Sequence, residues 1–212
     1  SSDVCSSDLS DTTHLSLLDA EGNAVATTQS INGWMGAGQV AAGTGIVLNN
    51  THDDFSIADG VANLYGAVGG VPNRLQPGKT PLSSMTPTLV FDPAPGSKPT
   101  MAIGAPGGTR IITCVLQVLL NRWIHGFPLA EAVARPRIHQ QWLPDELLLE
   151  DAAPQVGFAP GVVSALEARG HHVKRREIRC RVQAVERVAG QLQAAADPRD
   201  SGLALVRPAT KR

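Results

Sequence analysis

The chain has 212 residues, 42% of them hydrophobic, which is enough for one domain with a buried core. Its 18 basic and 19 acidic side chains give a formal net charge of -1, so no net field attracts nucleic acid or anionic lipid. These numbers exclude nucleic acid as a partner, and no apolar run reaches the roughly eighteen residues of a transmembrane helix. The three cysteines lack metal-ligand spacing and cannot all pair within the chain, which argues against a disulfide framework.

Residues 1–11 are left out of the predicted fold. The first nine, SSDVCSSDL, repeat Ser-Ser-Asp without periodicity and resemble a translated sequencing-adapter fragment. The chain also begins without a charged and then apolar leader, from which we expect that the natural amino terminus is missing. The predicted domain therefore covers residues 12–212.

The first predicted element is a β-hairpin. Its strands are expected in HLSLLD and AVATTQSI, joined by a tight turn in which Gly22 and Asn23 tolerate positive φ. The following glycine-rich stretch ends in GIVLNN, which predicts a short buried strand from Gly45. Residues 51–81 are rich in Gly, Pro, Asn and Asp, so we expect a long irregular loop, and such loops are usually functional or disordered.

The second half of the chain predicts strands, helices and then strands again. Apolar residues in RIITCVLQVLLNRWIH recur at the helical period, which predicts a helix that packs on a sheet and stops before Gly126 and Pro128. The other expected elements are strands in 85–92, 100–103 and 147–150, helices over 129–134 and 160–169, and two or three strands within 171–196. This order favours an α+β layered fold over an alternating parallel one.

Four short features could carry chemistry, and each also has an ordinary structural explanation. Thr12-Thr13-His14 precedes a strand and suits β-structure, Asp53-Asp54 suits a solvated loop, and Ser83-Ser84 suits a turn. Gly107-Gly108 precedes the long helix, where free backbone N–H groups could hold an oxyanion. Tight packing between strand and helix explains the glycines equally well, so both interpretations stay open.

Taken together and in order, several blocks of the sequence closely resemble the small subunit of γ-glutamyltranspeptidases. The blocks are TTHLSLLDAEGNAVATTQSIN, GTGIVLNNTHDDFS, PLSSMTPT, GAPGGTRII, RPRIHQQWLPDEL and ADPRDSG, and they span residues 12–202. The resemblance implies a four-layer αββα sandwich of the N-terminal-nucleophile hydrolase type. It also implies that this fold is incomplete without a large subunit cut from the same precursor.

The resemblance implies a catalytic role for four residues. The precursor of this family cuts itself before the first threonine of the TTH motif, here at the Asp11-Thr12 bond, and the freed amine of Thr12 then serves as base for its own hydroxyl. Ser30 stands where the family usually has a second threonine that supports the nucleophile; serine keeps the hydroxyl but lacks the β-branch. Gly107 and Gly108 match the amides that hold the oxyanion.

Five further residues match positions that bind the γ-glutamyl group. Asn32 and Asp54 are expected at the substrate α-ammonium, where a carboxylate makes a charge-assisted contact. Thr51 stands where relatives commonly carry glutamine or glutamate, so this second contact to the amine is shortened or lost. Ser83 and Ser84 match the pair that donates to the α-carboxylate, together with an arginine from the large subunit.

The expected activity is hydrolysis or transpeptidation of γ-glutamyl amides such as glutathione, with water, an amino acid or a peptide as acceptor. The resemblance implies no cofactor, and no metal site is expected at His52-Asp53-Asp54 because no further ligands converge there. His139 and Trp142 are expected to be structural. The resemblance to bacterial members of the family also implies a periplasmic or secreted enzyme.

Two alternatives remain at this level. The chain could belong to a glutaryl-cephalosporin-type acylase of the same superfamily, whose substrates lack an α-ammonium; Asp54 argues against this, and Thr51 weakens that argument. It could also be a catalytically inactive, unprocessed fragment, since half an active site cannot turn over substrate.

Overall fold

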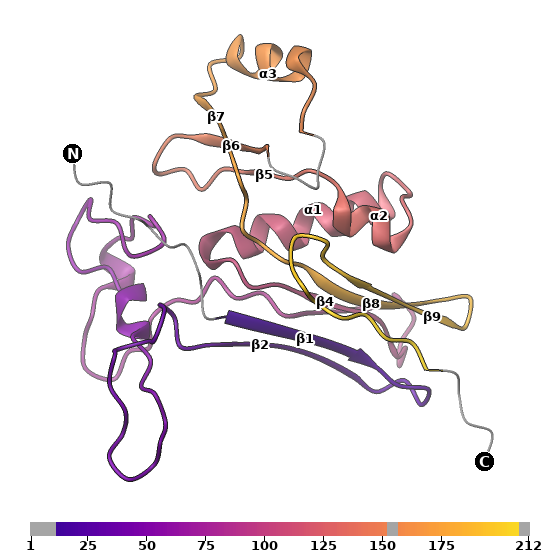
Figure 1. The fold of residues 1–212 in the computed structure, drawn as a ribbon, viewed down its shortest axis with the longest axis horizontal. Coiled ribbons are helices and arrows are strands. Elements are labelled where there is room, and N and C mark those ends of the chain that lie inside the picture. The colour runs from indigo at the N-terminus through magenta and orange to yellow at the C-terminus, as the bar shows by residue number, and fades with distance from the viewer. Residues whose placement is uncertain (1–11, 152–156, 208–212) are drawn as a thin grey trace.

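The computed structural model describes residues 12–151 and 157–207, so Asp11 of the expected cleavage site lies outside the described part (Figure 1). The strands are β1 (Thr12–Leu18), β2 (Ala24–Ser30), β3 (Thr88–Phe91), β4 (Pro99–Gly104), β5 (Ile138–His139), β6 (Leu147–Glu150), β7 (Val173–Arg176), β8 (Gln183–Val188) and β9 (Gln191–Ala196). The helices are α1 (Ile111–Trp123), α2 (Leu129–Ala134) and α3 (Pro160–Glu167), with 3-10 turns at Thr51–Asp54, Val71–Asn73 and Gly108–Arg110.

An antiparallel sheet in the order β3-β4-β8-β9 forms the centre of the fold. Its middle strand β4 is the most deeply buried, because Met101, Ala102 and Ile103 have no more than 1% of their surface exposed. The β8–β9 hairpin turns at Ala189-Gly190, where both residues have positive φ. Strands β8 and β9, near the end of the chain, therefore complete a sheet that begins with β3, about 95 residues earlier.

The central sheet is covered on both faces, as Figure 1 shows: α1 and α2 lie on one face and the β1–β2 hairpin lies on the other. The helical side holds the main core, which includes Ile103, Val115 and Ile178. The hairpin side is held by a smaller apolar cluster around Leu18 and Val185. The expected α+β fold is confirmed, and within the described residues the stack comprises the layers α, β and β.

A third, smaller sheet lies beyond the helices in the order β5-β6-β7. Strands β6 and β7 are parallel and are connected through α3, which packs Val163 against Leu147 and Leu149. The strand over 147–150 and the strands within 171–196 match the prediction. None of the helices in the described residues is long and apolar enough to cross a membrane.

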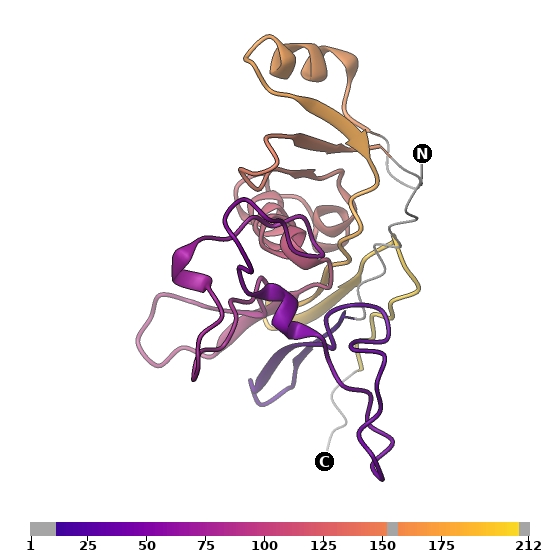
Figure 2. The same cartoon turned by 90° about the vertical axis from the view of Figure 1, so that its left-hand side faces the viewer.

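The expected buried strand in GIVLNN is wrong. Ile46 is 62% exposed and Leu48 is 41% exposed, and Val47 forms only an isolated bridge with Val40. The segment folds back on residues 37–41 through backbone hydrogen bonds, which leaves the side chains of Ile46 and Leu48 exposed. The long loop over 51–81 is confirmed as irregular, with two short 3-10 turns. Figure 2 shows the loops between β2 and β3 facing the viewer.

A cluster of buried charges joins the helical layer to the end of the central sheet. Arg137 and Asp197 form an ion pair of 2.7 Å with side chains at most 1% exposed, and Arg199 bonds both Asp197 and Glu150. Arg137 also donates to the carbonyl oxygens of Val133 and Cys180. Each charge thus has an opposite partner, which buried charges require.

Candidate active site

The register of the first hairpin places two hydroxyl groups side by side at the start of β1. Thr12 pairs with Ser30 across the two strands, and their Oγ atoms are 2.8 Å apart. The backbone N–H of Asn32 donates to Ser30 Oγ at 2.8 Å. Either hydroxyl can donate in the Thr12–Ser30 contact, and the bond from Asn32 holds Ser30 Oγ beside the threonine oxygen.

Asn32 turns the chain out of β2 and toward the loops. Its φ of 75° lies in the left-handed region, which asparagine tolerates better than most residues, and its side chain is buried. Nδ2 donates to the carbonyl oxygen of Asn50, and the carbonyl oxygen of Asn32 accepts a 2.5 Å bond from the hydroxyl of Tyr65. The contact of Asn32 with Thr12 therefore runs through Ser30.

Tyr65 connects Asn32, at the end of the first hairpin, to the glycine pair, and the sequence did not predict this contact. A Cβ at Gly108 would overlap the Tyr65 ring, and one at Gly107 would lie 3.0 Å from Cβ of Cys180. Both glycines have positive φ, at 146° and 59°, so conformation and packing each require glycine there. A lone tyrosine in a long loop with few apolar anchors was the one available signal.

Asp54 ends the 3-10 turn after the first loop and is half-buried. Its Oδ1 accepts only a long bond of 3.4 Å from Asn63 Nδ2. Burial and, to a lesser extent, the negative charge of Asp53 together raise the pKa of this carboxyl to about 6. A desolvated carboxylate with few donors is chemically suited to a cationic ligand.

Asparagine side chains hold the loop residues of the site together. Asn73 donates to the carbonyl oxygen of Asp54 at 2.7 Å and accepts from the backbone N–H of Leu82 at 3.1 Å, next to Ser83 and Ser84. Ser83 Oγ accepts from the backbone N–H of Met85, while the N–H of Thr51 donates to Asn49. These bonds connect the loop of Asp54 with the loop of the serine pair.

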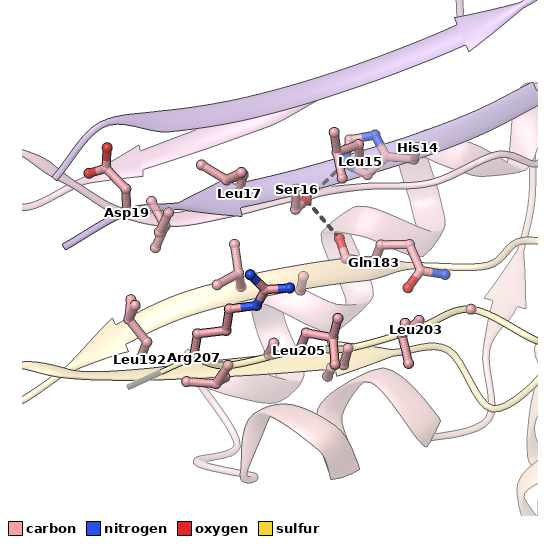
Figure 3. A pocket seen from close by; sticks show the side chains of 18 of the residues that line it. His14, Leu15, Ser16, Leu17, Asp19, Gln183, Leu192, Leu203, Leu205 and Arg207 are labelled. Carbon is pink, nitrogen blue, oxygen red and sulfur yellow. Dashed lines mark hydrogen bonds between the residues drawn. The ribbon is translucent and has the colours of Figure 1, made fainter. Parts of the chain in front are cut away.

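A groove of about 1280 Å³ runs along β1 and contains Thr12 (Figure 3). Its other wall is formed by β8, β9 and residues 202–207, with Leu203 and Leu205 facing Leu15 and Leu17 across it. The other expected site residues, from Ser30 to Gly108, do not line this groove. Within the described residues, no three or more His, Cys, Asp or Glu side chains gather as metal ligands.

Comparison with known proteins gives a consistent picture. The gamma-glutamyltranspeptidase family model matches residues 4–206. The glutathione hydrolase proenzyme of Escherichia coli K12 is 47% identical over 189 residues, which are 89% of this chain and 31% of that protein. The corresponding proenzyme of Pseudomonas aeruginosa is 41% identical over 92% of this chain and 34% of its own length.

Solved structures agree with the sequence comparisons. A γ-glutamyltranspeptidase from Pseudomonas nitroreducens, complexed with L-DON, has a TM-score of 0.83 and 38% identity, covering 92% of this chain and 100% of that chain. A cephalosporin acylase from Bacillus halodurans has a TM-score of 0.68 at 21% identity over 93% of this chain and 34% of that chain, which shows a shared fold alone.

The stacked sheets have the fold of the N-terminal-nucleophile hydrolases, the class to which the solved γ-glutamyltranspeptidase structures belong. Within that class, the chain belongs to the γ-glutamyltranspeptidase family and corresponds to its small subunit. It spans about a third of the length of the curated relatives named above.

Proposed function

We propose that this chain is the nucleophile-bearing subunit of an enzyme that cleaves γ-glutamyl amides such as glutathione. The observation that carries the proposal is the 2.8 Å contact between Thr12 and Ser30 at the start of β1, in a chain 47% identical to a glutathione hydrolase proenzyme. The proposed domain begins at Thr12, after cleavage of the Asp11-Thr12 bond.

In the proposed mechanism, cleavage frees the α-amine of Thr12, which removes the proton from its own Oγ1. Thr12 Oγ1 then attacks the γ-carbonyl carbon of the donor, and the Ser30 hydroxyl donates a hydrogen bond to Oγ1. The N–H groups of Gly107 and Gly108 stabilise the oxyanion that forms. The amine of the donor's scissile amide then leaves with the proton held by the Thr12 α-amine, and a γ-glutamyl-threonine ester remains. Water, an amino acid or a peptide then attacks the ester and releases Thr12.

The donor is recognised through its zwitterionic end in this proposal. Asp54 pairs with the α-ammonium, assisted by Asn32, while the hydroxyls of Ser83 and Ser84 donate to the α-carboxylate. Support comes from the raised pKa of Asp54, since a carboxylate that burial disfavours gains from a cationic partner. Thr51 has a shorter side chain than the glutamine or glutamate common at this position in relatives, so this second contact to the amine is shortened or lost.

The proposal includes a partner, the large subunit cut from the same precursor. Support comes from the length of the relatives and from the groove along β1, which holds Thr12 without the donor-binding residues. The arginine expected to complete the carboxylate contact would come from that subunit. We also propose export to the periplasm or medium, which cell fractionation with a cytoplasmic marker enzyme would check.

The activity is tested with the full-length precursor on γ-glutamyl-p-nitroanilide and glutaryl-p-nitroanilide, which differ by the α-ammonium. We expect cleavage before Thr12 and a preference of at least about tenfold for the γ-glutamyl substrate, because one charge-assisted contact is worth about 1.5–3 kcal/mol. A preference for the glutaryl substrate would indicate the acylase alternative. A precursor that is neither cleaved nor active would indicate that the protein has lost catalytic activity.

Replacing Ser30 with threonine should raise kcat about two- to fivefold, because the β-branch restricts χ1 and holds the hydroxyl toward Thr12. The measurement is kcat on γ-glutamyl-p-nitroanilide, with Ser30→Ala as the matched variant that removes the hydroxyl and should lower kcat. Equal activity of the serine, threonine and alanine forms would contradict the supporting role of Ser30.

Donor binding should depend on the ionisation of Asp54. Its pKa is raised to about 6, so the carboxylate is present above that pH and is protonated as the pH falls through it. We therefore expect protonation of Asp54 to lower kcat/KM for γ-glutamyl-p-nitroanilide about tenfold per pH unit below pH 6, on top of the fall that protonation of the Thr12 α-amine causes, since the neutral acid no longer attracts the ammonium.

Two variants control this pH prediction. Asp54→Asn should remove the steeper fall below pH 6, leave the fall caused by protonation of the Thr12 α-amine, and raise KM at pH 8, because the amide carries no charge. Asp53→Asn should move the steeper fall to lower pH, since the charge of Asp53 contributes to the raised pKa of Asp54. If the pH dependence of kcat/KM in the Asp54→Asn enzyme equals that of the wild type, the group that titrates near pH 6 is not Asp54.

A further inference from the structure

The inner face of β1 contains an unusual sequence of side chains. Thr12, His14, Ser16 and Leu18 share this face, which is turned toward the central sheet, while the residues between them are more exposed. Leu18 anchors the far end in an apolar cluster. Near Thr12 the corresponding buried position is filled by the imidazole of His14, which is 9% exposed.

Both ring nitrogens of His14 are hydrogen-bonded, and the bonds define one neutral tautomer. Ser16 Oγ donates to the carbonyl oxygen of Gln183 at 3.1 Å, so Nε2–H of His14 must donate to Ser16 Oγ at 2.9 Å (Figure 3). Nδ1 is then the acceptor for the hydroxyl of Thr28 at 2.7 Å. The imidazole thereby connects β1 with β2 and β8.

The imidazole ring lies against strand β4 of the central sheet. A Cβ at Gly104 in β4 would overlap the imidazole, so the ring occupies space that only glycine leaves open. Burial lowers the pKa of His14 to about 4, and the residues around the ring, Thr28, Gly104 and Gln183, carry no ionisable group. The ring is therefore neutral at neutral pH, as its two bonds require.

The position of the ring relates it directly to the nucleophile. His14 pairs with Thr28 in the hairpin register, and the next pair on the same inner face is Thr12 with Ser30. The Thr12–Ser30 contact depends on two small hydroxyl side chains, one of them without a β-branch. A rigid ring two residues away can fix the spacing between these strands and the sheet beneath them.

We propose that His14 is a positioning residue, whose imidazole joins β1 to β2, β4 and β8 and thereby holds Thr12 opposite Ser30. This inference rests on the proposed function, in which Thr12 is the nucleophile. His14 itself exchanges no proton with substrate. Its removal should displace Thr12 while the donor contacts, which lie on other loops, keep their geometry.

The test uses the full-length precursor with His14→Leu, His14→Gln and Ser16→Ala, and with His171→Leu as a control that removes an exposed histidine. His14→Leu should slow cleavage before Thr12 and lower kcat about 100-fold with KM within about twofold, because small displacements of a nucleophile are costly. His14→Gln should recover part of kcat, since its amide can donate to Ser16. The control should match the wild type.

Ser16→Ala keeps the ring but removes its link to Gln183, so it tests the inference even if His14→Leu fails to fold; kcat should fall about tenfold. The inference is overturned if His14→Leu or Ser16→Ala keeps wild-type kcat, or if glutamine recovers nothing in a folded protein. Failure of the proposed function has a different signature, because the wild-type precursor would then show no turnover that depends on Thr12.

Discussion

Replacing Thr12 with alanine in the full-length precursor should abolish both cleavage before residue 12 and turnover of γ-glutamyl-p-nitroanilide. Alanine retains the strand position but has no oxygen to attack either the peptide bond or the donor. The loss of kcat should be at least about 10⁴-fold, the order seen when a nucleophile is removed from a comparable catalytic group. Mass spectrometry of the precursor and a progress curve measure the two effects on one preparation.

Thr12→Ser is the matched control for this variant. Serine keeps the hydroxyl that lies 2.8 Å from Ser30 and loses only the methyl group that restricts χ1. Cleavage and turnover should both persist at reduced rates. Wild-type turnover in the alanine variant would remove Thr12 from the mechanism, whereas complete inactivity of the serine variant would indicate a role for the methyl group.

Replacing Arg137 with methionine should destabilise the protein by about 3–5 kcal/mol, because it removes one of the two cations that pair with the buried Asp197 and also removes two buried hydrogen bonds to carbonyl oxygens. Arg137 pairs with Asp197 and donates to the Val133 and Cys180 carbonyl oxygens in a region that is almost fully buried. The effect should appear as a lower midpoint in thermal unfolding of the precursor. The Thr12→Ala background keeps that precursor as a single chain during the measurement.

Arg175→Met provides the comparison for this experiment. Arg175 forms an ion pair with Asp151 at 3.3 Å, and both side chains are more than 40% exposed. Exposed pairs contribute about 0–1 kcal/mol, so the unfolding midpoint should hardly change. Equal effects of the two substitutions would show that burial does not set the contribution of Arg137.

Regular elements with a clear period were predictable from the sequence, and short or irregular ones were not. Helix α1 carries apolar residues at helical spacing, and its range was found within two residues. Strand β5 has only two residues and forms because β6 lies beside it, which no local pattern indicates. GIVLNN has the composition of a buried strand, but burial also requires a covering surface elsewhere in the chain.

The site shows the same division between local and tertiary information. Thr12, Asp54 and the glycine pair are predicted as site residues because their motifs resemble those of a family. The bonds of Asn73 and Tyr65 could not be foreseen, since each joins loop segments whose proximity depends on the complete fold. Asparagines in loops are too common for their presence alone to single them out.

The close packing of His14 on Gly104 also constrains how this sequence can evolve. Any side chain larger than hydrogen at position 104 meets the imidazole, so a substitution there is tolerated only after position 14 has changed to a smaller residue. Replacing His14 first leaves a cavity that a larger residue at position 104 can later fill. Among diverging descendants, the two positions should therefore vary as a pair, with the histidine replaced before the glycine.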